Sequence, residues 1–565
     1  MNKALPFVVL LALATTLPAQ QARESELVSA GLTGAPVGIS ISSENADLSA
    51  MLYADAGDAS LWLRLSDGRG IDWSSPIRMD DDITGAPKAT FRHSLKVDDN
   101  RIYLAWRDKR NGSFDDVYFT SSDDSGTTWL PSNIRIDDGY AMGAKDVKDF
   151  RIGSGGKDVV VICSTSNGDE GLFVTWSNNE GKVWNAALPV TSHNGIADVD
   201  NIDLACENDI AYIVWRDNSL NGIDDTIWMS IFDFSTGVFI AQDLNVSPNL
   251  ILAGGDADDG VAVAVDQNYL AVMYHADKLG GTSEQLRVNL SSDLGLSWSG
   301  DTQVGEYDNA LLNHDADNGV ILVEDARVAV AWEDNRTGQD AVYCAIAEFA
   351  TATFTADHLC SDTTLVAGNP HLAGELKNEA LAVVWSQFPG ETYSSCYYMN
   401  DRWSSTFSVS DNVADVDDAE VAWNDVYNNF LSLWVADDSG INQLYVGGYR
   451  AQQIDPGAPV AGSAAAFTLS GFLAGDAFQV VAAASPGSFL LTDGRNLGLR
   501  ADSYLLITKD LPQFRGGIAV DGTGSTAPLP IPQGLSGTSF YLVAVGLAPG
   551  GVITDLTDVT FMSIQ

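Results

Sequence analysis

The sequence predicts an all-β protein whose main part is a repeat of four-stranded units. The first observation is a phrase that recurs along residues 37–455: an apolar run ending in Trp or Tyr, then x-Asp and a polar loop. The second is that residues within each run alternate as they do in strands, whereas helical periodicity is almost absent. Such units cannot bury both faces alone, so we expect them to stack around an axis as a β-propeller.

The repeat is clearest in the unit around Trp106. A strand at residues 102–108 is followed by a second strand at 116–120 and by a tight turn at 122–129. Equivalent aromatic residues follow at steps of about 49 to 59 residues, with Cys163 or Ser164 in one place. They are Tyr53, Trp106, Trp215, Tyr274, Trp332, Trp385 and Trp434. This spacing predicts about eight blades, and seven is the alternative.

The tight turns carry a recognisable motif. Residues 122–129 read Ser-x-Asp-x-Gly-x-Thr-Trp, residues 291–298 depart from it once and residues 177–184 twice, and residues 66–73 are degenerate. On these residues the chain resembles the sialidase-like propellers with BNR, or Asp-box, repeats, over about 420 residues. The resemblance implies the propeller fold and places the boxes opposite the binding face. It says little about activity, because these propellers include hydrolases, lectin-like proteins and receptors.

The two ends of the chain differ from the repeat. Residues 1–20 begin with a short basic stretch and continue as an apolar run too short to span a bilayer, which predicts a signal peptide. We therefore expect a secreted or cell-surface protein without a membrane span. The repeat predicts a propeller domain at 30–455. A Pro- and Gly-rich linker then precedes a less acidic C-terminal domain at 461–565.

The C-terminal domain is expected to be a small β-sandwich. Strands are predicted at residues 478–481, 489–491, 504–507 and 540–544. The segment 529–532 and the pair Phe540-Tyr541 resemble the C-terminal β-sandwiches of exported bacterial proteins. Both a packed accessory domain and a surface-attachment module remain open.

Charge excludes one class of function. The chain has 30 Lys and Arg against 76 Asp and Glu, a net charge of −46. Phosphate would be repelled, so the protein is not expected to bind nucleic acid. The five cysteines are too few for a disulfide scaffold, although Cys344 and Cys360 could face each other across a predicted hairpin centred near Ala352.

Candidate binding residues lie in the loops after the Trp-x-Asp strands. Antiparallel strands bring these loops to the end of the ring where the innermost strands begin. The predicted binding residues are Asp108, Arg110, Asp217, Asp334 and Arg336.

A second acidic motif, Asp-x-Asp, recurs where each innermost strand begins. A ring of carboxylates around one mouth would favour Ca²⁺, although turn capping by the same residues is the alternative. The predicted metal ligands are Asp198, Asp200, Asp256, Asp258, Asp315, Asp317, Asp415 and Asp417.

Three functions remain open. The first is an extracellular binding module for glycan or protein, possibly Ca²⁺-dependent, and the second is a glycoside hydrolase using paired mouth carboxylates. The early Arg-Ile-Pro signature of sialidases is missing, and a ring of Asp would repel a sialic-acid carboxylate. The third is an architectural surface protein. The oligomeric state is not determined by the sequence.

Overall fold

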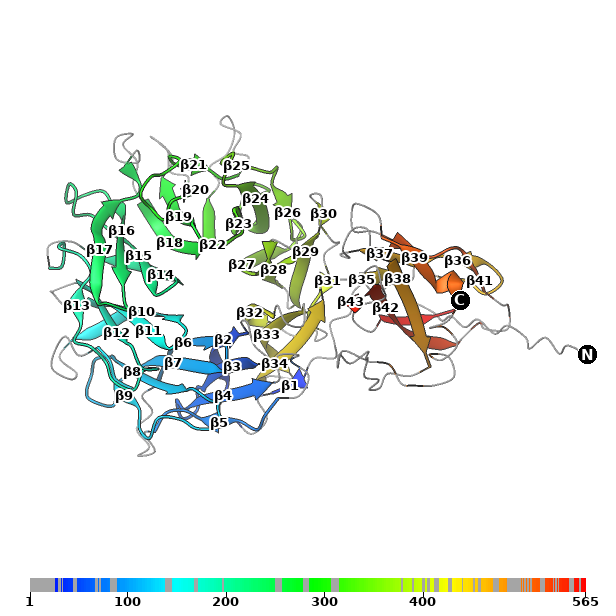
Figure 1. Cartoon of the computed structure of the whole chain (residues 1–565), viewed down its shortest axis with the longest axis horizontal. Helices are drawn as coiled ribbons and strands as arrows, with labels where there is room; N and C mark the ends of the chain where they lie inside the picture. Colours follow the sequence, from blue (N-terminus) through cyan, green and yellow to red (C-terminus); the bar gives the residue numbers. More distant parts are fainter. Residues whose placement is uncertain are drawn as a thin grey trace, which may run out of the picture.

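The computed structural model describes residues 26–564 with gaps, of which the longer ones are 82–88, 138–144, 249–256, 278–283, 306–314, 411–415, 471–476, 485–498, 519–523 and 548–552. The predicted signal peptide lies outside the described residues. Within them, eight antiparallel sheets of four or five strands are arranged in a ring, and three further sheets of two, three and five strands follow (Figure 1). The all-β prediction is therefore confirmed. No helix in the described part of the chain is long and apolar enough to cross a membrane.

The first four blades each run from an innermost to an outermost strand in chain order. Their strands are β2 (Pro36–Ser42), β3 (Ser49–Asp55), β4 (Leu61–Ser66), β5 (Ile77–Arg78); β6 (Ala89–Asp98), β7 (Arg101–Asp108), β8 (Asp116–Ser122), β9 (Ile134–Arg135); β10 (Asp146–Gly155), β11 (Asp158–Ser166), β12 (Gly171–Ser177), β13 (Leu188–Pro189); and β14 (Asp200–Glu207), β15 (Ile210–Asp217), β16 (Thr226–Asp233), β17 (Val238–Asn245).

The next four blades follow the same order, except that the last one takes its outer strand from the start of the chain. Their strands are β18 (Ala257–Asp266), β19 (Tyr269–Asp277), β20 (Glu284–Ser291), β21 (Thr302–Gln303); β22 (Ala316–Glu324), β23 (Arg327–Asp334), β24 (Ala341–Glu348), β25 (Thr353–Phe354), β26 (His358–Leu359); β27 (Val366–Glu375), β28 (Ala380–Phe388), β29 (Glu391–Tyr398), β30 (Arg402–Trp403), β31 (Phe407–Ser408); and β32 (Val416–Asn424), β33 (Asn429–Asp438), β34 (Ile441–Arg450) with β1 (Glu26–Leu27).

The first strand of the chain completes the last blade. β1 pairs with β34, with Leu27 opposite Tyr445, and the Val28 amide donates to the Leu444 carbonyl at 2.9 Å. Asn424 Nδ2 also donates to Ser43 Oγ at 2.7 Å, which joins the last blade to the first. These contacts connect residues from opposite ends of the repeat, so the ring is closed by tertiary pairing.

The core lies between blades. The second strand of each blade is covered on both faces, so β7 and β15 bury almost every residue. The tryptophans that end these strands are buried without exposed area: Trp106, Trp215, Trp332, Trp385 and Trp434. A strand that is covered on both faces requires a nearly continuous run of apolar residues. These runs are the pattern from which the repeat was predicted.

Each innermost strand begins with a β-bulge. The register shifts between Asp200 and Asp203, between Asp317 and Val320, and at the equivalent place in the other six blades. Asn201 and Asn318 follow the second Asp and have φ of 44° and 49°. Asn tolerates this left-handed backbone better than most residues do. The repeated Asp-x-Asp-Asn therefore marks a bulge at the mouth of the ring.

The tight turns between third and fourth strands share one hydrogen-bond pattern. Asp124 accepts from the Thr128 amide at 2.7 Å, while Ser122 Oγ accepts from the Gly126 amide at 2.8 Å. In the next blade Asn179 accepts from the Val183 amide in the same way. These side chains hold their own turns.

The C-terminal part forms two layers. One is a five-stranded sheet of β38 (Ala477–Ala483), β39 (Arg515–Gly517), β42 (Ser539–Leu547), β43 (Ile553–Leu556) and β44 (Thr560–Ser563). The other layer contains two smaller sheets, one of β35 (Gln453–Asp455), β37 (Thr468–Ser470) and β40 (Gly524–Ser525) and one of β36 (Ala464–Ala465) and β41 (Leu529–Pro530). A 3-10 turn occupies Pro512–Phe514. Phe467, Phe478, Phe514 and Phe540 meet in one buried cluster between them.

Three details differ from the sequence predictions. Residues 453–455 pair with β37 and so belong to the C-terminal sheets, and β1 places the start of the ring before residue 30. Strands are present at 478–481 and 540–544, whereas 489–491 and most of 504–507 lie outside the described residues. Cys344 and Cys360 share a core cluster as thiols rather than as a disulfide.

Replacing Gly181 with Ala should destabilise the ring more than replacing Gly156. Both glycines have positive φ, +79° and +66°, but a Cβ at Gly181 would lie 2.1 Å from the buried Phe119 ring, whereas at Gly156 nothing lies within 4 Å. We expect Gly156→Ala to cost about 1–2 kcal/mol from backbone strain alone, and Gly181→Ala to add roughly 1–3 kcal/mol of overpacking. Urea denaturation of both variants measures the difference. Equal costs would contradict the packing assigned to this turn.

Candidate functional site

Two sets of predicted residues come together at one end of the ring, which we call the loop end. It consists of the loops after the second strands (residues 109–115, 218–225 and 335–340) and the bulged starts of the innermost strands. The register places them side by side, because Asp108 is opposite Ala89, Asp200 opposite Arg216 and Ala316 opposite Asp334. The tight turns lie at the other ends of the same strands.

The loop aspartates Asp108, Asp217 and Asp334 face the protein. Each is buried, with an exposed fraction of 0–1%. Each accepts a hydrogen bond from the tryptophan Nε1 two residues earlier, at 3.4, 2.7 and 3.5 Å. Each also accepts from the amide two residues later, at 2.7, 2.9 and 2.8 Å. They cap their own loops, as Asx turns do.

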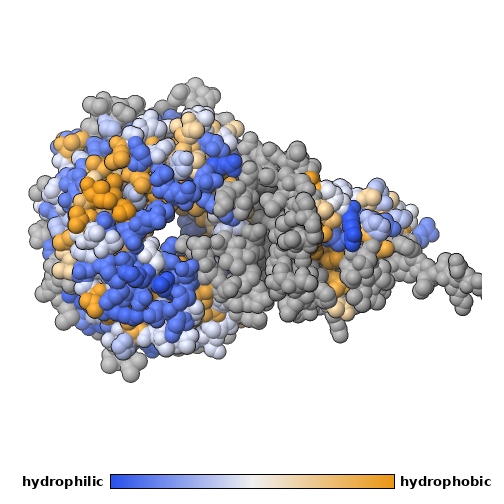
Figure 2. All heavy atoms as spheres, in the orientation of Figure 1, coloured by the Kyte–Doolittle hydropathy of each residue, from blue (hydrophilic) through white to orange (hydrophobic). Residues whose placement is uncertain are grey.

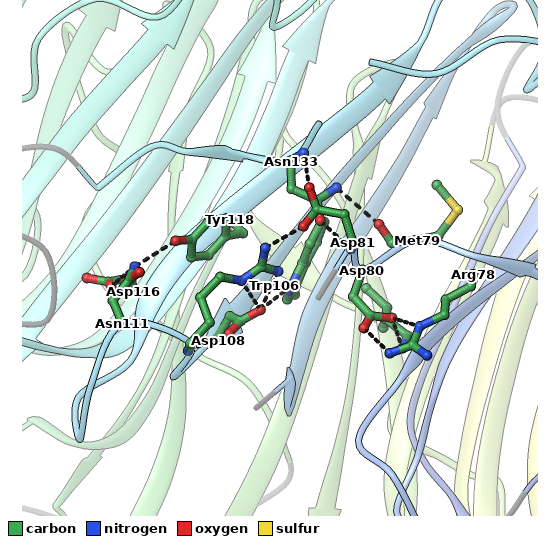
Figure 3. Close-up of polar contacts among 12 residues, drawn as sticks. Arg78, Met79, Asp80, Asp81, Trp106, Asp108, Asn111, Asp116, Tyr118 and Asn133 are labelled. Atoms are coloured by element: carbon green, nitrogen blue, oxygen red, sulfur yellow. Dashed lines mark hydrogen bonds and ion pairs between the residues drawn. The ribbon is translucent and has the colours of Figure 1, made fainter. Parts of the chain in front are cut away.

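Arg110 is held by the same network, of which Figure 3 labels Asp108, Asp81 and Tyr118. Its Nε and Nη2 donate to Asp108 at 2.8 and 2.5 Å, Nη1 pairs with Asp81 of the preceding connection, and the guanidinium lies 4.0 Å over the Tyr118 ring. Asp81 is in turn bonded to Asn133. Burial alone would lower the pKa of Arg110, but the two carboxylates outweigh burial and raise it.

Arg336 repeats this arrangement four blades on. It pairs with Asp334 and Asp357 at 2.6 Å each and lies 4.3 Å over Tyr343. The same partners raise the pKa of Arg336 against the effect of burial. Because two blades hold the same ion pair in the same way, we interpret both arginines as part of the framework of the loop end.

The residue after each strand-ending aromatic ties one blade to the next. Arg107 Nη1 donates to the Val147 and Lys148 carbonyls at 2.9 and 2.7 Å. His275 Nδ1 contacts the Ala316 carbonyl at 2.5 Å, and Glu333 accepts from the Asn369 amide at 2.5 Å. All of these partners lie in the bulge of the following innermost strand. Arg216 Nη1 donates to the Ala257 carbonyl at 3.4 Å in a similar way.

The inner-strand acids of β10 and β14 are paired with cations. Lys148 bonds Asp200 and lies 3.9 Å from Asp198. Arg151 lies 2.9 Å from Asp149 and 3.5 Å from Asp203. The lysines and arginines of the eight innermost strands are confined to β6 and β10. Lys148 and Arg151 partly offset the charge of these aspartates, and the repulsion of an acidic sugar stays an expectation from the sequence.

The remaining predicted metal ligands are placed only in part. Asp315 is half-buried and accepts from the Glu284 amide at 3.3 Å, and Asp317 is exposed. Asp256 and Asp415 lie outside the described residues, as do the side chains of Asp258 and Asp417. In the part of the chain that is described, no three His, Cys, Asp or Glu side chains converge as metal ligands would. The described residues thus do not form a calcium site, and Ca²⁺ stays a prediction from the sequence.

Sequence reasoning missed His193 and Asp137. His193 contacts Asp217 at 2.8 Å from a connection between blades, with no motif to single it out. Asp137 follows β9 and pairs with Arg135 at 2.9 Å. Burial raises the pKa of Asp137 to about 7 despite this partner. In the sequence, Asp137 is marked only by its place after Arg135-Ile136, the first two residues of an Arg-Ile-Pro signature, where proline would be expected.

Comparison with known proteins adds no family. No family model matches the chain, and neither does any curated protein. Among solved structures, an ulvan lyase of the polysaccharide lyase class matches at 9% identity and a TM-score of 0.41, covering 72% of this chain and 97% of that one. A mutant sialidase from Trypanosoma rangeli matches at 11% and 0.31, covering 74% and 88%.

A third match is an α-L-arabinofuranosidase from Fusarium graminearum, at 11% identity and a TM-score of 0.32, covering 58% of this chain and 99% of that one. At these values the likenesses carry no information about activity. The fold assignment rests on the sheet order and the ring seen in Figure 1.

Replacing Arg110 with Ala should be strongly destabilising. The change leaves the Asp108 carboxylate, 2% exposed, without its cation, and breaking a buried pair in this way typically costs about 3–5 kcal/mol. Arg92→Ala is the matched control, because Arg92 is 60% exposed and 3.4 Å from Asp149, so a loss below about 1 kcal/mol is expected. Urea denaturation compares the two. Similar losses would show that Arg110 is not part of the framework.

Asp137 should make stability depend on pH. Because its folded pKa is raised above the unfolded value, the folded state binds the extra proton and stability falls as pH rises from about 4 to about 7. Asp137→Asn should remove roughly 1–3 kcal/mol of this fall and leave a constant offset from the lost ion pair, while Arg135 keeps its contact with Asp116 at 3.1 Å. Denaturation at several pH values measures both curves. Parallel curves would contradict a raised pKa.

Proposed function

We propose that this protein is an extracellular binding module that holds a glycan or a protein at the loop end of its ring. One observation carries the proposal. The buried carboxylates and arginines of the loops bond to one another and to the loop backbone. The side chains that remain exposed at this end are charged or apolar, and both kinds can contact a ligand. These are Arg92, Lys109, Lys148 and Asp198, exposed by 60, 41, 37 and 58%, with Leu220 and Ile223 exposed by 51 and 80%.

A rigid framework favours binding. The loop 218–225 is held by hydrogen bonds from the Ile223 and Asp224 amides to Asn221, each 2.8 Å long. A preformed loop loses little conformational freedom when a ligand binds. The face in Figure 2 is also mostly hydrophilic over β6–β8, beside the opening of the ring, which suits a polar ligand.

Hydrolysis of a glycan is the alternative. A glycoside hydrolase needs two carboxyl groups that flank the scissile bond, and Asp217 and Asp334 were the sequence candidates. Both are buried beneath their loops, which favours the binding proposal over this one. Incubating the protein with a panel of glycans and measuring the products released tests this alternative.

Binding to a glycan panel tests the proposal. We expect the double variant Arg92→Ala/Lys148→Ala to bind its ligand at least about tenfold more weakly than the wild type, because it loses two charge-assisted contacts. Lys182→Ala is the control, since Lys182 is 46% exposed but lies in a tight turn at the opposite end, paired with Asp123. Runs with millimolar Ca²⁺ and with a chelator show whether binding depends on calcium.

Equal loss in the double variant and in Lys182→Ala would place the ligand elsewhere. Product release without measurable retention of ligand would favour the hydrolase.

A further inference from the structure

The loop end contains a pocket that recurs in three blades and is filled differently in one of them. In each blade a loop aspartate faces an aromatic ring on the third strand. The register pairs Trp106 with Tyr118, Trp215 with Trp228 and Trp332 with Tyr343, so the three rings are equivalent. Between the aspartate and the ring lies Arg110 in the first case and Arg336 in the third.

In the blade of β14–β17 this pocket holds a histidine. Ser219 stands where the other blades have arginine, two residues after the aspartate. The space is taken by His193, which enters from the connection after β13. Its ring meets Trp228 edge-on at 4.7 Å, and its Nδ1 lies 2.8 Å from Asp217. A titratable imidazole thus replaces a permanently charged guanidinium.

The contacts determine which ring nitrogen carries the proton. Ser219 Oγ lies 2.5 Å from the other Asp217 oxygen and donates its hydrogen there, so towards Nδ1 at 3.0 Å it can only accept. The Asp217 carboxylate also only accepts. Both neighbours of Nδ1 therefore require an N–H, which leaves the lone pair of the neutral ring on Nε2.

Nε2 is available to a ligand. Among the residues that the structure describes, none forms a hydrogen bond with it, and the His193 side chain is 14% exposed. His93 differs, because both its ring nitrogens are buried without a partner. Asp217 is the charged group in contact with the His193 ring. Asp243 of β17 bonds the neighbouring Ser192, and Trp228 adds no charge.

We propose that His193 is a proton acceptor of the loop end, whose Nε2 takes a hydrogen bond or a proton from a ligand hydroxyl. In the proton transfer, the ligand O–H bond breaks, its electron pair stays on oxygen, and the new N–H bond forms on Nε2. Asp217 is the positioning residue, because it holds the ring by Nδ1 and offsets the charge of the imidazolium. The assignment of the hydroxyl to a glycan rests on the proposed function. The tautomer of His193 and the access to its Nε2 do not depend on that function.

Diethyl pyrocarbonate tests the proposal without a ligand. Nε2 attacks one carbonyl of the reagent and ethyl carbonate leaves; the ring gives up its Nδ1 proton, and the protonated ethyl carbonate breaks down to ethanol and carbon dioxide. In the folded full-length protein at neutral pH we expect His193 to be modified at least about tenfold faster than His93, because both ring nitrogens of His93 are buried. Mass spectrometry of peptides measures each rate.

Two variants distinguish the positioning of the His193 ring by Asp217 from the access of the reagent to Nε2. Asp217→Asn should slow the modification of His193 several-fold, because it removes the carboxylate that accepts from Nδ1–H and so keeps the lone pair on Nε2, and Ser219→Ala should leave the rate within about twofold. Circular dichroism confirms that each variant is folded. If Asp217→Asn does not fold, the wild-type rates still decide the proposal. A His193 rate as low as that of His93 overturns it.

Ligand binding supplies the second test. A protonated Nε2 cannot accept a hydrogen bond, so binding of a hydroxyl donor should weaken in acidic solution, and His193→Gln should flatten that dependence. A pH profile unchanged by His193→Gln would overturn the role in binding. If no glycan binds at all, the proposed function fails while the modification rates stand on their own.

Discussion

The hydrogen-bonding requirement of a buried tryptophan organises the loop end of this protein. In five blades the strand between neighbours ends in a buried tryptophan, which brings an indole N–H with it. In three of these blades the acceptor is an aspartate two residues later. Burying that carboxylate requires further donors, which Arg110 and Arg336 supply as cations and His193 supplies through its Nδ1–H. In a fourth blade Gln387 accepts from Trp385 at 3.4 Å, and a neutral amide needs no counter-ion.

This chain of requirements changes how the acidic motifs are interpreted. The loop aspartates Asp108, Asp217 and Asp334, which the sequence offered as binding residues, are buried and accept hydrogen bonds from backbone amides. Function has to be sought in what the framework leaves exposed, namely the cations of β6 and β10, the loop carrying Leu220 and Ile223, and the one pocket where histidine replaces arginine. A departure from a repeat is informative because the repeat itself shows what structure alone requires.

The repeat could be predicted because it depends on local rules. Strand alternation, aromatic ends such as Trp106 and Trp332, and turn residues such as Gly181 follow from requirements that each blade meets separately. The pairing of β1 with β34 could not be predicted, because its partners are more than 400 residues apart in the chain and two residues carry no periodic signal. The same holds for Asp81, which approaches Arg110 from the preceding blade.

The sequence by itself determined an all-β chain, the period of its blades, the residues that fill the space between them and the end of the ring where loops and bulges gather. Only the tertiary structure decided which charges remain exposed. Asp108, Asp217 and Asp198 look alike in a row of letters, yet two are buried and one is exposed. The difference arises because burial and pairing depend on side chains from neighbouring blades, such as Lys148 and His193, whose approach no local pattern encodes.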